Sequence, residues 1–309
     1  MLPYLRRSSP PLGPLTPSLE QLADELRRDV SLLAIDVGPR GTHSPLAYRL
    51  AEDLLGAAFA GAGFEVRRHG WEANGVRCVN LETVLPGSVH PERIVVLGAH
   101  YDSVVGCPAA NDNASGVAGV LAIARRLQGR PRACTVRFVL FGNEEPPFFN
   151  LGEMGSQLYA RACRDAGDDI RGMACLETIG YYSGQRGSQR WPGNLLSLGL
   201  PDVGDFISMV GPVSARSFIE RCAEAFERRA AFPLLAAAVP ETLAEQVSWS
   251  DHRGFNEVDY PAFMVTDTAP LRDPHYHLPT DTPERLDYGS MARVVAAMQG
   301  VIEDVADSL

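Results

Sequence analysis

The sequence predicts an α/β protein with a central mixed, mainly parallel β-sheet sandwiched by helices. Two observations lead to this prediction. Segments with the pattern of strands alternate along the chain with segments that have the pattern of helices, which is the order that an α/β layer architecture produces. Two of the strand segments, 93–102 and 134–143, are almost continuously apolar, and such runs are typical of strands buried on both faces of a parallel sheet.

The first hundred residues combine a proline-rich segment with two helices and three strands. Residues 1–17 are expected to form a poorly structured, proline-rich lead. Ser18 has the features of a helix N-cap, with Gln21 at the capping-box position. A second helix is expected from Ser44 to about Ala60, because glycines follow it. The three expected strands span residues 64–71, 76–85 and 93–102.

The rest of the chain continues the alternation of helices and strands. Residues 213–230 are expected to form a strong amphipathic helix, with Phe218, Cys222 and Phe226 on one face. Further helices are expected at 116–129, 155–167 and 288–306, and further strands at 134–143, 172–180 and 260–267. Because no internal repeat or linker appears, residues 18–309 are expected to form a single domain.

Composition and charge exclude several functions. The 309 residues carry a net charge of −10 without a block of basic residues, so nucleic acid and anionic membranes are poor partners. The chain contains no lysine, which excludes a lysine base, a Schiff base and a P-loop lysine. Its six cysteines include no CxxC pair and are expected to be reduced, buried thiols. No signal peptide is seen, so a cytoplasmic location is expected.

Side chains that bind metals follow the ends of the predicted strands, where α/β proteins place their functional groups. They are His100, Asp102, Asp112, Glu144, Glu145 and Glu177, and a late loop adds His275 and His277. Zinc prefers imidazole nitrogen and carboxylate oxygen. Two neighbouring ions would also need a bridging carboxylate. The predicted ligands are therefore His100, Asp112, Glu145, Glu177 and His277, with Asp112 as the bridge.

The adjacent glutamates of the sequence NEEPP (143–147) suggest a division of labour. A hydrolytic metal site needs one carboxylate on the metal and another near the attacking water, free to accept its proton. We assign Glu145 to the metal and Glu144 to the role of general base. Pro146 and Pro147 would stiffen the turn. Asp102, two residues after His100, suits a carboxylate that orients the imidazole ring.

Each of these residues also has an ordinary structural interpretation. A single histidine such as His100 or His277 is more often structural, a pair of glutamates is usually solvated, and Asp112 resembles a helix N-cap. His275 is a possible substitute for His277. Only the combination of ligand types at several strand ends favours a metal site.

Four neighbouring residues have a structural alternative as well. Cys107 and Cys175 lie close to predicted ligands in the sequence but are expected to be buried thiols. Trp249 and Phe255 could line a substrate pocket, or could pack in the core.

The order of these motifs resembles the co-catalytic di-zinc aminopeptidases of metallopeptidase family 28, a family that also includes glutamate carboxypeptidase, glutaminyl cyclase and the transferrin-receptor ectodomain. The motifs are HYDS (100–103), NDNASG (111–116), NEE (143–145), ETIG (177–180) and YHLPTDT (276–282). The resemblance covers the chain from about residue 44 to its end. It implies the zinc-aminopeptidase (phosphorylase/hydrolase-like) fold, with residues 18–309 as the catalytic domain.

The resemblance also implies roles for individual residues. His100, Asp112, Glu145 and His277 match zinc ligands, Glu144 the base and Asp102 the carboxylate beside His100. Tyr276 matches a tyrosine that stabilises the oxyanion, Asp251 matches a supporting acidic residue, and a cis peptide is implied after Asp112. Two features depart from the family pattern. Glu177 stands where aspartate is usual, and the segment 146–156 is longer than in most members.

The implied function is that of a zinc-dependent aminopeptidase acting on peptides or small aminoacyl substrates. It would hydrolyse N-terminal peptide or aminoacyl amide bonds with a metal-bridged water and Glu144 as general base. Two zinc ions per chain are expected, or one if Glu177 does not bind metal. The alternatives are a single-zinc acyltransferase similar to glutaminyl cyclase, and a non-catalytic receptor-like or scaffolding protein. The motifs HYDS, NDNASG and NEE resemble the two-metal form more than the cyclase, and retention of all five ligand positions argues against a non-catalytic protein. The sequence gives no indication of oligomeric state.

Overall fold

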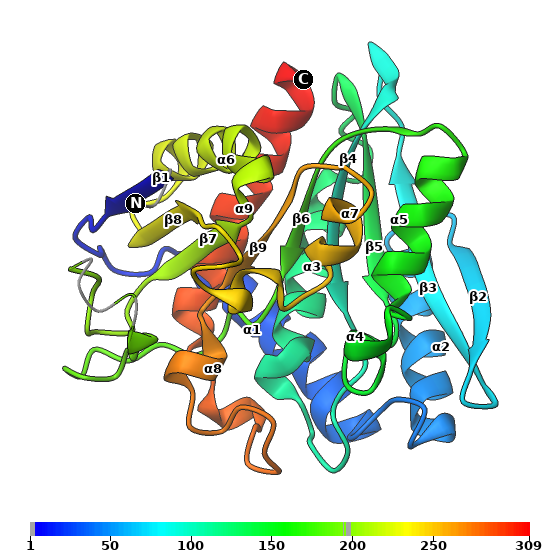
Figure 1. Ribbon diagram of the computed structural model, residues 1–309, viewed down its shortest axis with the longest axis horizontal. Coiled ribbons are helices and arrows are strands. Elements are labelled where there is room, and N and C mark those ends of the chain that lie inside the picture. The colour runs from blue at the N-terminus through cyan, green and yellow to red at the C-terminus, as the bar shows by residue number, and fades with distance from the viewer. Residues whose placement is uncertain (1–3, 194, 196–198) are drawn as a thin grey trace.

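A nine-stranded sheet forms the centre of the computed structural model, which describes residues 4–193, 195 and 199–309 (Figure 1). The strand order across the sheet is β1-β8-β7-β9-β6-β4-β5-β3-β2. The strands are β1 (Tyr4–Ser8), β2 (Arg67–Ala73), β3 (Val76–Leu85), β4 (His90–His100), β5 (Cys134–Phe141), β6 (Asp169–Leu176), β7 (Ile207–Gly211), β8 (Leu234–Ala238) and β9 (Ala262–Thr266).

The sheet is mixed, with its parallel strands at the centre. Strands β9, β6, β4 and β5 run parallel to one another. Antiparallel pairs lie outside them, from β5 through β3 to β2 on one side and between β9 and β7 on the other. The predicted mixed α/β sheet is therefore confirmed. Because neighbouring parallel strands end at the same edge, the segments that follow β4, β5 and β6 meet there.

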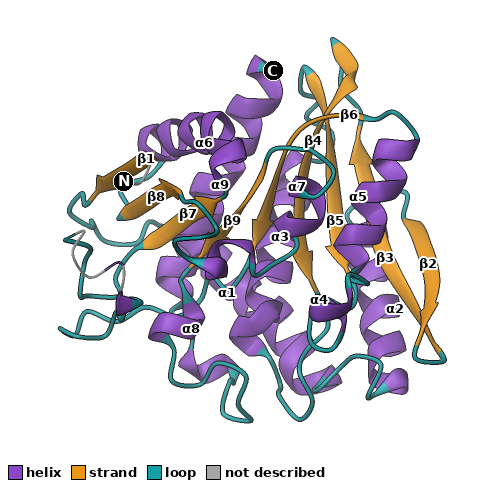
Figure 2. Cartoon of the chain, in the orientation of Figure 1, coloured by secondary structure: helices purple, strands orange, loops and turns teal. Residues whose placement is uncertain are grey.

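Helices cover both faces of the sheet, as Figure 2 shows. One face carries α1, α2, α3, α6 and α9, among which α9 contacts α1, α3 and α6. The other face carries α5, which packs against α7. The longer helices are α1 (Pro17–Ser31), α2 (Pro45–Gly61), α3 (Gly116–Leu127), α5 (Gly155–Asp165), α6 (Arg216–Arg229) and α9 (Tyr288–Ser308), and the short ones are α4 (Phe148–Leu151), α7 (His252–Asn256) and α8 (Ala269–Arg272). Among the described residues, no helix combines the length and the apolarity needed to cross a membrane.

The N-terminal segment is more ordered than the sequence predicts. Residues 1–3 of the expected lead lie outside the described residues, but residues 4–8 form β1 at the edge of the sheet, paired with β8. Arg6 anchors this strand, because its Nε donates to Glu227 of α6 at 3.0 Å. The expectation of a poorly structured lead is wrong for this strand, since its partners lie more than 200 residues away in the sequence.

The first helix begins slightly earlier than predicted. Thr16 is its N-cap, and the Thr16 hydroxyl accepts a hydrogen bond from the backbone N–H of Leu19. Pro17 occupies the first helical position, where the missing N–H costs nothing. Ser18 therefore lies inside the first turn, and its predicted role as the cap is wrong.

Candidate metal centre

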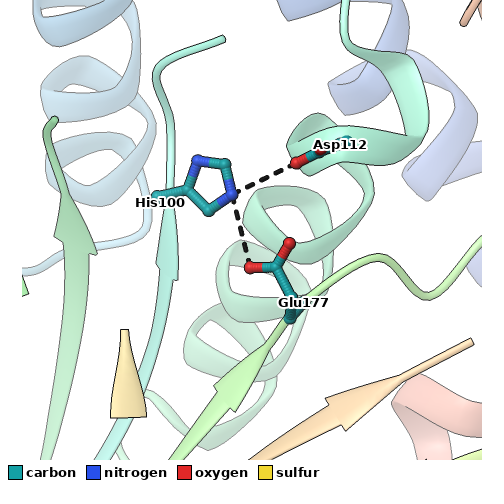
Figure 3. A group of neighbouring side chains, drawn as sticks. All are labelled: His100, Asp112 and Glu177. Atoms are coloured by element: carbon teal, nitrogen blue, oxygen red, sulfur yellow. Dashed lines mark ion pairs between the residues drawn. The ribbon is translucent and has the colours of Figure 1, made fainter. Parts of the chain in front are cut away.

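Three predicted ligands meet at the C-terminal edge of the parallel strands. His100 is the last residue of β4, Asp112 precedes α3, and Glu177 follows β6. Figure 3 shows the three side chains converging. The Nε2 atom of His100 lies 3.2 Å from Oδ1 of Asp112 and 3.3 Å from Oε2 of Glu177. The three side chains form one group of potential metal ligands.

A second group shares Asp112 with the first. The Nε2 atom of His277 lies 3.0 Å from Oδ2 of Asp112 and 3.4 Å from Oε2 of Glu145. Asp112 thus presents one carboxylate oxygen to each group. In each group one ligand atom from every residue lies within 4.8 Å of the others. This is the arrangement that a carboxylate bridging two ions requires.

The unpaired polar atoms of the centre fit metal ligands. Both ring nitrogens of His100, Oδ1 of Asp112, Oε1 of Glu145 and Nε2 of His277 are buried without a hydrogen-bond partner. Buried polar atoms are almost always paired in folded proteins. Metal coordination would satisfy these atoms, whereas burial without any partner would carry an energetic cost.

The charge of the centre also favours bound cations. Burial raises the pKa of Glu144 and of Glu145 well above the usual range, and neighbouring carboxylates raise both pKa values further. Burial likewise raises the pKa of Asp251 to about 7. Two imidazoles cannot balance this many carboxylates, so positive metal ions would relieve the repulsion among them.

Asp102 joins the ends of β4 and β5. Its Oδ1 accepts a hydrogen bond from the backbone N–H of Glu144 at 3.0 Å, and its Oδ2 accepts one from Glu145 at 3.2 Å. The same Oδ1 lies 3.5 Å from Nδ1 of His100. Asp102 is therefore placed beside the imidazole, as predicted, and it also fixes the backbone of the two glutamates, which the sequence did not indicate.

The backbone around Asp112 is fixed by hydrogen bonds and by close packing of α3 against β6. The Asp112–Asn113 peptide is cis, as the resemblance implied. The Asp281 carboxylate accepts hydrogen bonds from the backbone N–H groups of Asn111 at 2.8 Å and Asp112 at 3.1 Å. A Cβ at Gly116 would lie only 2.3 Å from the carbonyl oxygen of Leu176, so glycine allows α3 to approach β6 closely. Asp281 was not singled out, although it belongs to the YHLPTDT motif.

Arg40 is a further residue that sequence reasoning missed. Its side chain is completely buried, and its guanidinium donates only to backbone carbonyl oxygens. These include Tyr101 O at 2.6 Å, Pro108 O at 2.8 Å and Ala109 O at 3.1 Å. Arg40 thus ties together both ends of the loop between His100 and Asp112. No pattern in the sequence distinguishes it from the other arginines.

Glu177 is positioned by Ser250, which precedes the short helix α7. The Ser250 hydroxyl donates to Oε2 of Glu177 at 2.7 Å, and Nδ2 of Asn113 lies 3.4 Å from the same oxygen. This support explains how the longer glutamate side chain is directed toward His100.

We expect Ser250→Ala to weaken one metal site only. Loss of a residue that orients a ligand typically lowers metal affinity by about 10- to 100-fold. Chelator competition monitored by metal analysis should therefore show one ion released early from Ser250→Ala, while the other is retained as in the wild type. Ser18→Ala, a change at an exposed serine, is the control. Equal loss of both ions, or of neither, would contradict this role.

Two other predicted residues lie beside the centre. The Tyr276 ring stacks on the His277 imidazole, with centroids 3.9 Å apart. Asp251 is fully buried, and neither of its carboxylate oxygens has a hydrogen-bond partner. His100 lowers the pKa of Asp251 while Glu177 raises it, so Asp251 lies within electrostatic reach of both.

The residues with two interpretations in the sequence have different positions in the structure. His275 lies outside both ligand groups, and its Nδ1 is 3.0 Å from the Thr280 hydroxyl. Phe255 packs in the core, whereas Trp249 lines a pocket next to the centre.

The cysteines fit the expectation of buried thiols. All six are described, free and buried. The Cys107 thiol donates to Leu278 O at 3.1 Å, and the Cys175 Sγ lies 3.5 Å from the Ser250 hydroxyl.

The fold and the metal centre together define a class of protein, the metal-dependent hydrolases with a mixed α/β sheet. The particular family is shown by sequence comparison. The family model of peptidase family M28 matches residues 80–302, so the chain belongs to this family. The family predicted from the motifs is therefore confirmed. The predicted enzyme class, the metallo-aminopeptidases, is confirmed with it.

Individual relatives cover most of the chain. It is 33% identical over 280 residues to the uncharacterized protein YfbL of Escherichia coli, an alignment that spans 88% of this chain and 85% of YfbL. In fold it is similar to a zinc aminopeptidase from Bacillus subtilis, with a TM-score of 0.73, 14% identity and coverage of 93% and 95% of the two chains. It is also similar to glutaminyl cyclase from Fimbriiglobus ruber, with a TM-score of 0.66, 22% identity and coverage of 96% and 99%.

Proposed function

We propose that the protein is a zinc-dependent exopeptidase, specifically an aminopeptidase that hydrolyses N-terminal peptide or aminoacyl amide bonds. The observation that carries the proposal is the pair of ligand groups that share Asp112. The similar B. subtilis structure is described as a zinc aminopeptidase, which supports zinc as the metal. We also propose that residues 18–309 act as one catalytic domain, and the cytoplasmic location stays a prediction.

The proposed metal ligands follow from the two groups. His100, Asp112 and Glu177 would hold one ion, and Asp112, Glu145 and His277 the other. When bound, zinc supplies Lewis acidity, which lowers the pKa of water and polarises a carbonyl group. The His100–Asp112–Glu177 group depends on Glu177, for which Ser250 and Asn113 supply hydrogen bonds.

Glu144 is the proposed general base. It is buried beside the centre, its backbone is fixed by Asp102, and it belongs with His100 and Glu145 to a third group of converging side chains. Burial raises the pKa of Glu144, so the carboxylate is basic enough to accept a proton from water and then to donate it to the leaving amine. The Tyr276 hydroxyl would donate a hydrogen bond to the carbonyl oxygen as negative charge develops there.

The pocket beside the centre supports an aminopeptidase over a carboxypeptidase. It is bordered by Glu177 and Tyr276, and most of its other lining side chains are apolar. Among the described lining residues, Glu177 is the only charged one. Such a pocket would accept an apolar N-terminal side chain, whereas recognition of a terminal carboxylate or an acidic side chain would require a cation.

A single-zinc glutaminyl cyclase is the second candidate. Its support is that Oε2 of Glu177 already accepts a hydrogen bond from Ser250, whereas Oε1 of Glu145 and Nε2 of His277 have no hydrogen-bond partner. The group that contains Glu145 and His277 could therefore be the one that holds a single ion. A panel of aminoacyl amides, assayed beside a peptide with N-terminal glutamine, separates the two functions. The proposal expects hydrolysis of leucine amide. Release of ammonia by cyclisation of the glutamine peptide alone would favour the cyclase.

A further inference from the structure

The apolar pocket next to the centre extends across the outer half of the sheet. Its floor contains a row of side chains on four successive strands. Strand register pairs Met264 of β9 with Val210 of β7, Val210 with Ala237 of β8, and Ala237 with Leu5 of β1. All four residues line the pocket. The row therefore runs from the strand beside β6 to the edge of the sheet.

A second row lies beside the first and is displaced from it by two residues on each strand. Thr266 pairs with Ser208, and Ser208 pairs with Leu235. These three residues also line the pocket. Glu177 continues this row, because the preceding Leu176 pairs with Val265 of β9. The metal centre is thus at one end of the pocket and Leu5 is near the other.

The pocket is longer than any amino-acid side chain. Neighbouring strands lie about 4.8 Å apart, so the four spacings from β6 to β1 correspond to ~19 Å. A lysine side chain, with four methylenes and bonds of about 1.5 Å, reaches roughly 6 Å from its Cα. About 970 Å³ of empty space lies in the pocket and in its opening to solvent taken together. An N-terminal side chain would fill only the part nearest the metal centre.

The chemical groups that line the pocket determine which ligand could fill the part beyond the N-terminal side chain. Backbone groups of the inner floor strands β7 and β8 face partner strands on both sides. The Trp191 indole N–H is also occupied, because it donates to Pro201 O at 2.7 Å. Because most of the lining side chains are apolar, a peptide extended along the pocket would leave most of its own N–H and C=O groups unpaired, at a cost of about 1–3 kcal/mol each. An alkyl chain carries no such groups.

We propose that the enzyme also hydrolyses amides of long-chain fatty acids, with the alkyl chain in this pocket. The proposal rests on the proposed function, because the same groups would cleave the amide. The oxygen of water forms a bond to the carbonyl carbon and the C–N bond breaks. Glu144 accepts the proton of the water and transfers it to the leaving nitrogen, which releases a fatty acid and an amine. In a staggered chain with bonds of about 1.5 Å, roughly 14 carbons span the pocket.

A series of acyl p-nitroanilides tests the proposal, with leucine p-nitroanilide as the aminopeptidase reference. Each buried methylene can contribute up to about fourfold, so we expect kcat/KM to rise at least ~100-fold from the hexanoyl to the tetradecanoyl substrate. A flat or falling series, with leucine p-nitroanilide still cleaved, would overturn this inference alone. Failure to cleave either class would overturn the proposed function as well.

Variants at the two ends of the pocket locate the alkyl chain. Leu5→Trp closes the outer end, which should shift the preferred chain from about 14 to about 10 carbons, one strand spacing shorter. Leu5 is 42% exposed, so the substitution is compatible with folding. Leu12→Trp is the matched control, because Leu12 is 49% exposed and does not line the pocket. Identical chain-length profiles for the two variants would contradict the proposal.

A binding measurement avoids any dependence on turnover. Titration calorimetry of tetradecanamide into zinc-free protein should show saturable binding that is at least ~10-fold weaker in Leu5→Trp than in Leu12→Trp, because the displaced methylenes lose their buried contacts. Equal affinity in the two variants would place the chain elsewhere and overturn the proposal.

Discussion

Glu144→Gln is expected to lower kcat for aminoacyl amides by about 10²- to 10⁴-fold, the usual contribution of a general base. Glutamine has nearly the same shape as glutamate but cannot accept a proton from water. The backbone N–H of residue 144 would still donate to Asp102, so the loop should keep its conformation. Steady-state kinetics with leucine amide measure the effect, and metal analysis should show unchanged zinc content.

The control for this variant is Glu153→Gln, which changes an exposed glutamate. It should retain wild-type kcat. Turnover by Glu144→Gln within tenfold of the wild type would remove Glu144 from the role of base. Loss of zinc together with activity would instead indicate that Glu144 is a metal ligand.

Asp112→Asn is expected to cause the second large effect, the loss of both metal ions. Asp112 is the one residue common to the two ligand groups, with Oδ1 toward His100 and Oδ2 toward His277. An asparagine amide has one oxygen and no negative charge, so it can neither bridge two ions nor balance their charge. Elemental analysis should give less than half of the wild-type zinc content, and activity should be undetectable.

Single-site ligand changes provide the comparison for Asp112→Asn. Glu177→Ala should lose one ion and His277→Ala the other, while Asp53→Asn at an exposed position should lose none. If Asp112→Asn retained as much zinc as Glu177→Ala, Asp112 would not be the bridge.

The metal-binding residues at the strand ends were predictable from the sequence because each of them ends or follows an apolar run. His100 ends an apolar run, Glu144 and Glu145 follow another, and Glu177 follows a third. Buried parallel strands place such residues at one edge of the sheet, so periodicity and ligand type together were enough to bring them to one site.

The supporting residues were not predictable in the same way, because their partners are distant in sequence. Arg40 binds carbonyl oxygens more than 60 residues away at the end of β4 and beside Asp112. Ser250 supports Glu177 across 73 positions. Neither residue lies in an apolar run or a strong motif, so only the fold brings it to the centre.

The outer strands were missed for a related reason. β8 has the sequence LLAAA, which carries no alternation and fits a helix as well as a strand. β1 contains two arginines and precedes a proline-rich stretch. Their pairing with each other and with β7 determines their conformation, and this pairing also creates the long apolar pocket.

Metal stoichiometry is the measurement that tests the central claim most directly. The protein would be purified without chelators and analysed for zinc by elemental mass spectrometry, with protein concentration from amino-acid analysis. Two ligand groups that share Asp112 predict two zinc ions per chain. The absence of bound zinc, with none taken up when zinc is added, would contradict the account.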